Sequence, residues 1–357
     1  MTAPASIPAV VVGTGFGCRI HVPALRAAGF EVAAIVGTNP GKTEKRAGQN
    51  GIARWFTDLD AAITQTGAKL VTIATPPATH GALALQAIAH GCHVLCEKPF
   101  AFDAAEGQAM LDTAEKAGIV HAVAHEFRWM PDRALFGRAI AEGMIGTPRF
   151  LAIDQFIPFC ADPATPLPKW WFDPAMGGGW LGAGGSHLLD QIRAWLGEIT
   201  DLSGRLFLVS DREADADDSY SLRFGMANGV EGSMQQTAGA WGPMTTLWRC
   251  AGTHGTVWIE AGKVMVADKA GTRELPVPDD LRLPPPPPAA DPASPNRLSH
   301  FELGPFTRLA EALYGKIAGT GHQPPVALPT FADGLAAMKI IDAIRKSSAA
   351  GGALVSV

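Results

Sequence analysis

The sequence predicts a protein of class α/β plus α+β, with an N-terminal doubly wound parallel sheet and a second domain built on a mostly antiparallel sheet. The first reason is length, because 357 residues exceed what one ordinary core accommodates. The second is an alternation of apolar runs and helical segments, and the third is a later succession of strand-like stretches. We place the boundary at residue 127, which gives domains 1–127 and 128–357.

The first domain is predicted from apolar strands that alternate with helices. The expected strands are 9–13, 31–37, 70–75, 93–98 and 119–124, and the expected helices are 19–28, 41–49, 59–66, 78–90 and 103–117. Apolar strands separated by helices indicate a parallel sheet that is covered on both faces. Right-handed crossovers then make the sheet doubly wound.

The second domain begins with an expected helix at 131–143, where Pro131 suits the first turn. The strand-like stretches that follow are 149–157, 202–210, 219–227, 230–238, 245–252 and 256–268. Turn signals such as Ala-Asn-Gly at 227–229 favour antiparallel pairing. We expect the proline-rich segment 283–295 to be a solvated surface loop and 331–351 to be a closing helix.

Composition narrows the class of partner. The chain is 47% hydrophobic and 18% charged, with a net charge of −5 and no basic run, which argues against nucleic acid or an anionic membrane surface as a partner. No stretch approaches the roughly 18 apolar residues of a membrane span. Five scattered cysteines indicate a reducing compartment, so we expect the cytoplasm. No spacing of His, Cys and Asp predicts a metal site.

A glycine-rich turn follows the first expected strand. Gly13 and Gly15 provide the tight turn and the bare backbone that a pyrophosphate needs at a helix N-terminus. The third glycine of the dinucleotide pattern is replaced by Cys18. We therefore predict cofactor contacts from the residues of the turn, which are Gly13, Thr14, Gly15, Phe16 and Gly17. The alternative is a glycine-rich turn without a ligand.

The end of the second strand bears on which cofactor is used. A ribose-binding acid is expected there, but the sequence has Thr38 and Asn39, followed by Lys42, Lys45 and Arg46. Because no carboxylate would repel a 2′-phosphate, NADP is favoured over NAD.

Lys98 closes the strand-like run 93–98. A lysine at the carboxyl end of a parallel strand points to the edge where ligands bind in this fold class. A desolvated lysine can donate or accept a proton. The alternative interpretation is a solvated lysine at a strand end.

The stretch GGGWLGAGGSHLLD, residues 177–190, places six glycines within nine positions. We predict Ser186 to cap a helix whose first turn holds His187. There the helix dipole disfavours the imidazolium, and a neutral imidazole can take a proton from a hydroxyl. Asp190 could orient the ring, or it could pair with the dipole.

Further candidates flank the expected domain boundary. Arg128 and Glu126 either contact substrate or cofactor or form an ion pair between domains. Four tryptophans either line a pocket or belong to the core, namely Trp129, Trp170, Trp171 and Trp180. We name Arg128, Trp180 and Asp190 as candidates for substrate binding.

Four motifs in order resemble the glucose–fructose oxidoreductase/inositol dehydrogenase (Gfo/Idh/MocA) family. They are GTGF…H at 13–21, ATPPATH at 74–80, CEKP at 96–99 and GGGW…GSHLLD at 177–190. The resemblance covers nearly the whole chain. It implies a Rossmann domain, a large open sheet whose outer face forms a homodimer or homotetramer, and NAD(P)-dependent hydride transfer on a small hydroxyl or carbonyl substrate such as a sugar or cyclitol.

The resemblance also implies residue roles. Lys98 would contact nicotinamide and substrate, with a cis peptide bond before Pro99, and Lys98 and His187 would move the hydroxyl proton. The cofactor path would be lined by Thr75, Pro76 and His80, with Glu97 beside the nicotinamide ribose. The chain departs from the family pattern at Ala183, where an Asp that shares the proton relay usually stands.

Two other functions remain open from the sequence. One is a hydrolase or lyase that retains its cofactor and acts by transient oxidation. The other is a non-catalytic nucleotide-binding protein, which the absence of the Asp at position 183 keeps in consideration.

Overall fold

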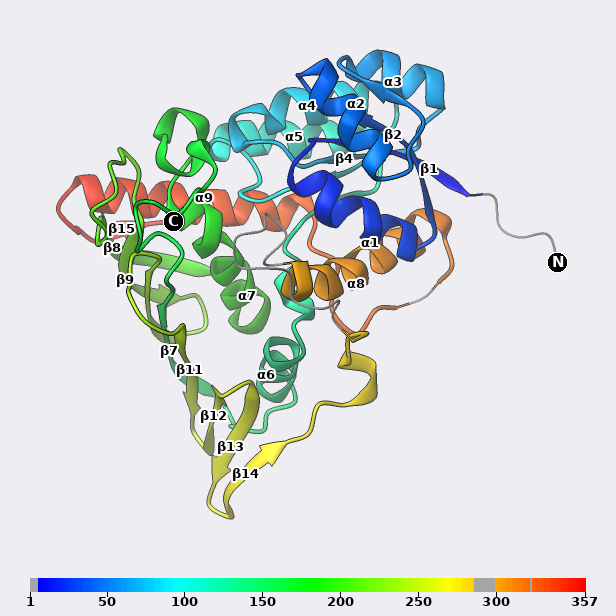
Figure 1. Ribbon diagram of the computed structural model, residues 1–357. Helices are drawn as coiled ribbons and strands as arrows, with labels where there is room; N and C mark the ends of the chain where they lie inside the picture. The colour runs from blue at the N-terminus through cyan, green and yellow to red at the C-terminus, as the bar shows by residue number, and fades with distance from the viewer. Residues whose placement is uncertain (1–5, 286–298, 322) are drawn as a thin grey trace. The chain divides into compact units, whose positions relative to one another are not determined.

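The computed structural model describes residues 6–285, 299–321 and 323–357 (Figure 1). Contacts divide the chain into two compact units. The first unit consists of Met1–Trp129 and Leu283–Leu335, and the second of Met130–Arg282 and Ala336–Val357. The described residues of 283–335, which the sequence division placed in the second domain, are grouped with the first unit.

The first unit contains a six-stranded sheet in which every strand pair is parallel, with strand order β3-β2-β1-β4-β5-β6. The predicted doubly wound sheet is confirmed. Its strands are β1 (Ile7–Val12), β2 (Phe30–Val36), β3 (Trp55–Phe56), β4 (Leu70–Ile73), β5 (His93–Cys96) and β6 (His121–Val123). The sequence did not predict β3, which has only two residues and so offers no alternating pattern.

The helices of this unit begin and end at local signals. Asn39, Asp58 and Asp103 cap α2, α3 and α5 through their side chains. Gly67 and Gly118 end α3 and α5 in the left-handed conformation. The helices are α1 (Val22–Ala27), α2 (Pro40–Gln49), α3 (Leu59–Thr66), α4 (His80–Ala89), α5 (Ala104–Ala117) and α8 (Ser299–Ala318), and residues up to Leu335 of α9 (Phe331–Ala349) also belong here.

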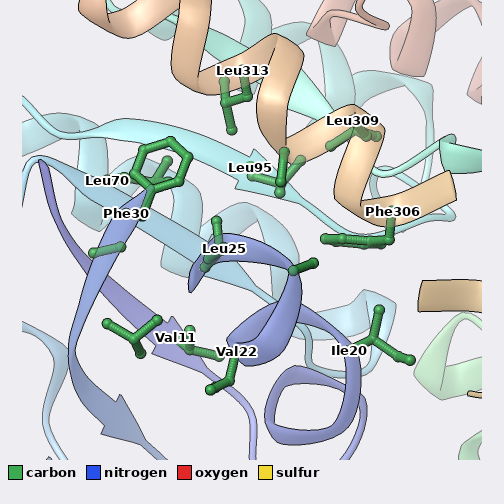
Figure 2. Packing of buried hydrophobic residues seen from close by; sticks show 14 of the residues in the cluster. Val11, Ile20, Val22, Leu25, Phe30, Leu70, Leu95, Phe306, Leu309 and Leu313 are labelled. Carbon is green, nitrogen blue, oxygen red and sulfur yellow. The ribbon is translucent and has the colours of Figure 1, made fainter. Parts of the chain in front are cut away.

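Helix α8 was not predicted from the sequence, yet it completes the core of the first unit. Its buried side chains Phe306, Leu309 and Leu313 belong to one apolar cluster with Leu25 of α1 and Phe30 of β2 (Figure 2). Removing such side chains from water is the main favourable term in folding. This cluster explains why the late segment packs with the N-terminal sheet.

The second unit contains a nine-stranded sheet of order β14-β13-β12-β11-β7-β10-β9-β8-β15. Only β7 and β10 pair in parallel, so the expected mostly antiparallel sheet is confirmed. Its strands are β7 (Pro148–Phe156), β8 (Ile199–Phe207), β9 (Ser219–Met226), β10 (Glu231–Thr237), β11 (Thr245–Gly252), β12 (Gly255–Glu260), β13 (Lys263–Asp268), β14 (Gly271–Leu275) and β15 (Val355–Ser356). The predicted run 256–268 is a hairpin, and β14 and β15 were not predicted.

Helices α6 (Pro131–Ala141) and α7 (Ser186–Leu196) belong to the second unit. Trp195 of α7 contacts Trp248 of β11 with ring centroids 5.7 Å apart, which defines the inner face of the sheet. Among the described residues, no helix has the length and apolarity that crossing a membrane requires. Most of the proline-rich segment expected to be a solvated loop lies outside the described residues.

Candidate active site

The glycine-rich turn after β1 combines close packing with one open position. Gly13 has φ +119°, and a Cβ there would overlap the carbonyl oxygen of Ala74. A Cβ on Gly17 would lie 2.9 Å from Val11 Cγ1. Gly15 is exposed, and a Cβ there would meet nothing within 4 Å. The turn therefore leaves bare backbone at its tip, which fits the approach of a pyrophosphate.

The residues after this tip form a short π-helical turn, Gly17–His21, that leads into α1. Phe16 packs edge-on against His21 at 5.7 Å, and the Arg19 guanidinium lies 5.2 Å from the Phe16 ring centre. Cys18 is buried, with Sγ 3.9 Å from the Gly13 carbonyl oxygen. A small buried residue thus takes the place of the usual third glycine.

The end of β2 lies against the same turn. A Cβ on Gly37 would meet Thr14 Cγ2 at 2.5 Å, so the two loops touch. Thr38 and Asn39 are exposed, and the Asn39 side chain accepts a hydrogen bond from the Lys42 amide at 2.9 Å. Burial raises the pKa of the Cys18 thiol, while the charges of Arg46 and Lys42 oppose this rise. Positive charge therefore reaches the base of the turn.

His80 links two of the predicted cofactor loops. Its side chain is fully buried, with Nε2 2.8 Å from the Thr75 carbonyl oxygen and Nδ1 3.1 Å from that of Pro99. Burial lowers the pKa of His80, although these carbonyl groups favour the imidazolium. A neutral ring donates from only one nitrogen. His80 thus positions the loops that carry Thr75, Pro76 and Pro99 rather than presenting its side chain to solvent.

Lys98 follows β5 and is partly exposed. The peptide bond between Lys98 and Pro99 is cis, as the resemblance implied. Glu97 is buried beside it and accepts hydrogen bonds from His21 Nε2 at 3.0 Å and from the Lys98 amide at 3.1 Å. Burial alone would raise the pKa of Glu97, but the hydrogen bond and charge of His21 and the charge of Lys98 lower it overall.

Glu126 is close enough to Glu97 and Lys98 for their charges to act on it, which the sequence did not predict. It lies in a 3-10 turn, Glu126–Trp129, and is 2% exposed. Burial and the negative charge of Glu97 raise its pKa well above the ordinary value, while Lys98 acts in the opposite direction. The end of β5 therefore holds one carboxyl group that favours the ionised form and one that favours the protonated form.

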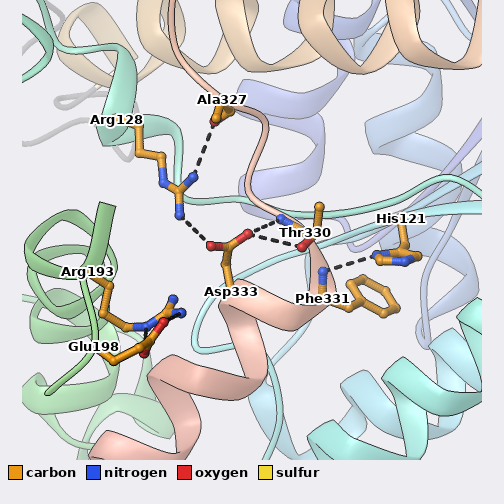
Figure 3. Close-up of polar contacts among 8 residues, drawn as sticks. All are labelled: His121, Arg128, Arg193, Glu198, Ala327, Thr330, Phe331 and Asp333. Atoms are coloured by element: carbon orange, nitrogen blue, oxygen red, sulfur yellow. Dashed lines mark hydrogen bonds and ion pairs between the residues drawn. The ribbon is translucent and has the colours of Figure 1, made fainter. Parts of the chain in front are cut away.

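Arg128 contributes to an ion pair inside the first unit. Its Nη2 lies 3.0 Å from Asp333 Oδ1, and its Nη1 donates to the Ala327 carbonyl oxygen at 3.3 Å (Figure 3). Asp333 also accepts from the amide and hydroxyl of Thr330 at 2.8 and 3.0 Å. The ion pair considered for Arg128 thus exists, but both partners belong to one unit. The side chain holds segment 327–333.

The helix that carries His187 begins earlier than predicted. The helical run starts at Trp180 and passes through a π-helical turn, Leu181–Gly185, into α7. The first two amides of this run are hydrogen-bonded to Asp217, a residue outside the helix. Trp180 N donates to the Asp217 carbonyl oxygen at 2.7 Å, and Leu181 N donates to Asp217 Oδ2 at 2.8 Å. Burial raises the pKa of Asp217 to about 6, although the Leu181 amide opposes this.

The prediction that Ser186 caps this helix was wrong. Ser186 has helical backbone angles, and its hydroxyl donates to the Gly182 carbonyl oxygen at 2.6 Å. Local sequence made Ser186 the best cap, but the actual acceptor comes from Asp217, far along the chain. His187 therefore does not lie in the first turn, so the helix dipole no longer explains its protonation state.

Neighbouring atoms of the second unit leave no room for side chains at four glycines of this stretch. A Cβ on Gly178 would overlap the Trp170 carbonyl oxygen. A Cβ on Gly179, where φ is +115°, would overlap the Asp217 carboxylate. At Gly184 it would lie 2.7 Å from the Trp180 ring, and at Gly185 it would lie 2.9 Å from Tyr220 Oη. Close internal packing accounts for these four glycines.

His187 and Asp190 are buried in α7, at 3% and 0% exposure. Asp190 lies well inside the helical run, which removes first-turn dipole pairing as its explanation. Trp180 is buried, with Trp171 at 5.6 Å and Phe159 at 5.7 Å between ring centres. Trp129 instead belongs to the core of the first unit.

The structure thus groups the predicted residues in two sets. The glycine-rich turn, the 75–80 loop and Glu97-Lys98 belong to the first unit, and Trp180, His187 and Asp190 belong to the second. The joint action of Lys98 and His187 stays a prediction. Within the described ranges, no group of three His, Cys, Asp or Glu side chains could hold a metal ion.

Comparison with known proteins agrees with this arrangement. Residues 7–125 match an oxidoreductase family with an NAD-binding Rossmann fold, and residues 136–258 match the GFO/IDH/MocA C-terminal domain. Levoglucosan dehydrogenase of Pseudarthrobacter phenanthrenivorans is 29% identical over 247 residues, which are 62% of this chain and 63% of that protein, less than two thirds of its length. D-xylose 1-dehydrogenase (NADP(+)) 2 of Haloferax volcanii is 25% identical over 348 residues, covering 96% and 98%.

A solved structure of levoglucosan dehydrogenase in complex with NADH and levoglucosan has a TM-score of 0.84 to this chain at 26% identity, and the match covers 99% of each chain. The two family matches together cover more than half of the sequence. The chain therefore belongs to the GFO/IDH/MocA family of oxidoreductases, whose N-terminal domain is an NAD-binding Rossmann fold.

Proposed function

We propose that this protein is an NAD(P)-dependent dehydrogenase that oxidises a hydroxyl group of a small sugar or cyclitol, or reduces the corresponding carbonyl. The observation that carries the proposal is the buried His21–Glu97 pair, which holds the Lys98 amide at the end of β5. A partly exposed lysine fixed at this edge of a doubly wound sheet is placed where ligands bind in such folds. The named dehydrogenases among the relatives support the substrate class.

The chemistry is divided between the cofactor and the side chains. When bound, the nicotinamide supplies the hydride acceptor. Lys98 orients the reacting hydroxyl, and Lys98 and His187 exchange its proton. Because Ala183 stands where relatives of this family usually have an Asp, no carboxylate at that position takes part. Burial of His187 excludes bulk water from the proton acceptor.

We propose NADP as the preferred dinucleotide, with NAD as the alternative. The exposed Thr38 and Asn39 at the end of β2 carry no charge that would repel a 2′-phosphate, and Lys42 and Arg46 bring positive charge to the same turn. The relative whose name includes NADP(+) supports this preference, whereas the levoglucosan dehydrogenase complex contains NADH.

We further propose that the outer face of the nine-stranded sheet forms a homodimer or homotetramer. Four large apolar side chains are exposed on this face, at 48% for Phe150, 54% for Phe156, 43% for Phe207 and 39% for Leu247. Exposed apolar side chains on one sheet face favour burial against a second copy. Light scattering on the purified protein measures the oligomeric state directly. The cytoplasm stays our proposal for its location.

The absorbance of reduced nicotinamide at 340 nm tests the function across a panel of sugars, polyols and aldehydes. Steady cofactor turnover with one class supports a dehydrogenase. Product formation without net change in nicotinamide would indicate a cofactor-retaining hydrolase or lyase instead. Tight cofactor binding without any turnover would indicate a non-catalytic nucleotide-binding protein, which the alanine at position 183 keeps as an alternative.

A further inference from the structure

Three polar side chains form a row across the inner face of the nine-stranded sheet. The strand register places Tyr220 of β9 opposite Gln236 of β10, and Gln236 opposite Gln155 of β7. Their exposed fractions are 1%, 5% and 4%. Burying hydroxyl and amide groups is unfavourable unless they are hydrogen-bonded, so this row requires an explanation.

The hydrogen bonds of the row all run from Tyr220 towards Gln155. The Tyr220 hydroxyl donates to Gln236 Oε1 at 2.6 Å, and Gln236 Nε2 donates to Gln155 Oε1 at 2.6 Å. Because each amide has its oxygen engaged by the preceding donor, the amide orientations are fixed along the row. The Oε1 atom of Gln155 is used as an acceptor in this row, whereas its Nε2 group donates no hydrogen bond within the described part of the chain. The row therefore ends in a pair of N–H donors whose direction is set.

The two ends of the row lie in different surroundings. At the Tyr220 end, a Cβ on Gly185 would lie 2.9 Å from the hydroxyl oxygen, so the row reaches the backbone two residues before His187. At the other end, the register places Gln155 opposite Thr246 of β11, which is exposed. The row thus runs from beneath the helix that carries His187 to an open part of the same sheet face.

We propose that Gln155 binds an oxygen atom of the substrate through its free N–H pair, and that this substrate is an uncharged sugar. The inference rests on the proposed dehydrogenase function and adds a specificity-determining residue to it. A neutral donor suits a hydroxyl or ring oxygen. The three side chains carry no positive charge, and the Asp217 carboxyl acts electrostatically on Tyr220. A sugar acid would meet no compensating cation in the row.

In this arrangement Gln236 and Tyr220 are positioning residues. Without the Tyr220 hydroxyl, the Gln236 amide can rotate, and the Gln155 donors lose their fixed direction. The expected consequence is weaker substrate binding with unchanged cofactor binding. Preorganised donors improve binding mainly because less side-chain ordering remains to be done.

The test compares four purified proteins, namely wild type, Gln155→Leu, Tyr220→Phe and the control Gln235→Leu. Gln235 is the exposed neighbour whose side chain points to the opposite sheet face. Loss of one hydrogen bond in a desolvated site should raise KM for a neutral sugar about 10- to 100-fold in Gln155→Leu, with kcat changed far less. Tyr220→Phe should raise KM by a smaller factor, and Gln235→Leu should behave like wild type.

A series of deoxy sugars separates a binding role from a structural one. The KM difference between wild type and Gln155→Leu should disappear for the one deoxy analogue that lacks the bound hydroxyl. Equal losses for every analogue, an unchanged KM, or a preference of wild type for uronic acids over neutral sugars would each overturn the inference. Cofactor affinity, measured by fluorescence titration, should be equal in all four proteins.

A binding experiment distinguishes failure of this inference from failure of the proposed function. If no sugar reduces the cofactor, the proposed function fails, and NMR of the side-chain amide groups then decides the inference alone. The Gln155 signal is assigned by its absence in Gln155→Leu. A shift of that signal on addition of neutral sugars supports the subsite, and a signal that no sugar moves overturns it.

Discussion

The carboxyl group of Asp217 should make the stability of the protein depend on pH in a direction opposite to that of most carboxylates. Burial raises its pKa from 3.8 to about 6. Between these values the folded protein binds the proton more tightly than the unfolded chain does. Stability from this group is therefore fully present below about pH 4 and is lost as pH rises through 6.

The size of the effect follows from the shift. A difference of about two pKa units corresponds to about 3 kcal/mol in the free energy of unfolding, at about 1.4 kcal/mol per unit. Because Asp217 is only partly buried, this value is an upper limit. The substitution Asp217→Asn keeps an oxygen to accept from the Leu181 amide but removes the ionisation. The variant should equal wild type near pH 4 and exceed it in stability near pH 7.5.

Urea unfolding followed by tryptophan fluorescence at a series of pH values measures this difference. The control is Asp215→Asn, which removes an exposed carboxylate two residues away. Its difference from wild type should stay within about 0.5 kcal/mol, as for surface substitutions in general. Two results would contradict the raised pKa of Asp217. One is a difference in unfolding free energy between Asp217→Asn and wild type that stays constant from pH 4 to 7.5, and the other is a variant that becomes less stable than wild type as pH rises.

Three further predictions concern the first unit. Lys98→Ala should lower kcat at least about 100-fold if the amine takes part in proton transfer, and steady-state assays would expose the assignment as wrong if kcat barely moved. Gly13→Ala should cost at least about 2 kcal/mol, because its φ is unfavourable for alanine and its Cβ overlaps the Ala74 carbonyl, whereas Gly15→Ala should leave the unfolding midpoint nearly unchanged. Thr38→Asp should weaken NADP binding at least about tenfold relative to NAD, and a fluorescence titration showing an unchanged ratio contradicts the proposed phosphate site.

The sequence predicted those features that have a local physical signature. The buried strands read as apolar runs, and caps such as Asn39 and Asp103 mark helix starts that the pattern located within a few residues. Helix α8 was missed because it follows a proline-rich stretch and contains Pro305, which weakens the helical pattern. Its membership of the first core depends on contacts with residues about 280 positions earlier.

The candidate site shows the same limit. The glycine-rich turn, Lys98 and His187 could be named from motifs. The cap of the His187 helix could not, because the Asp217 acceptor comes from a distant segment and Ser186 satisfied the local rule better. The partner of Arg128 was likewise set by the tertiary position of Asp333.

The contribution of α8 to the first core has a consequence for exchanging parts between relatives. A fragment ending at Trp129 would leave the apolar surface around Leu25 and Phe30 without Phe306, Leu309 and Leu313. Such a fragment should aggregate when expressed alone. A chimera designed to transplant cofactor preference must therefore carry two separate stretches of sequence, one with the N-terminal strands and one with α8.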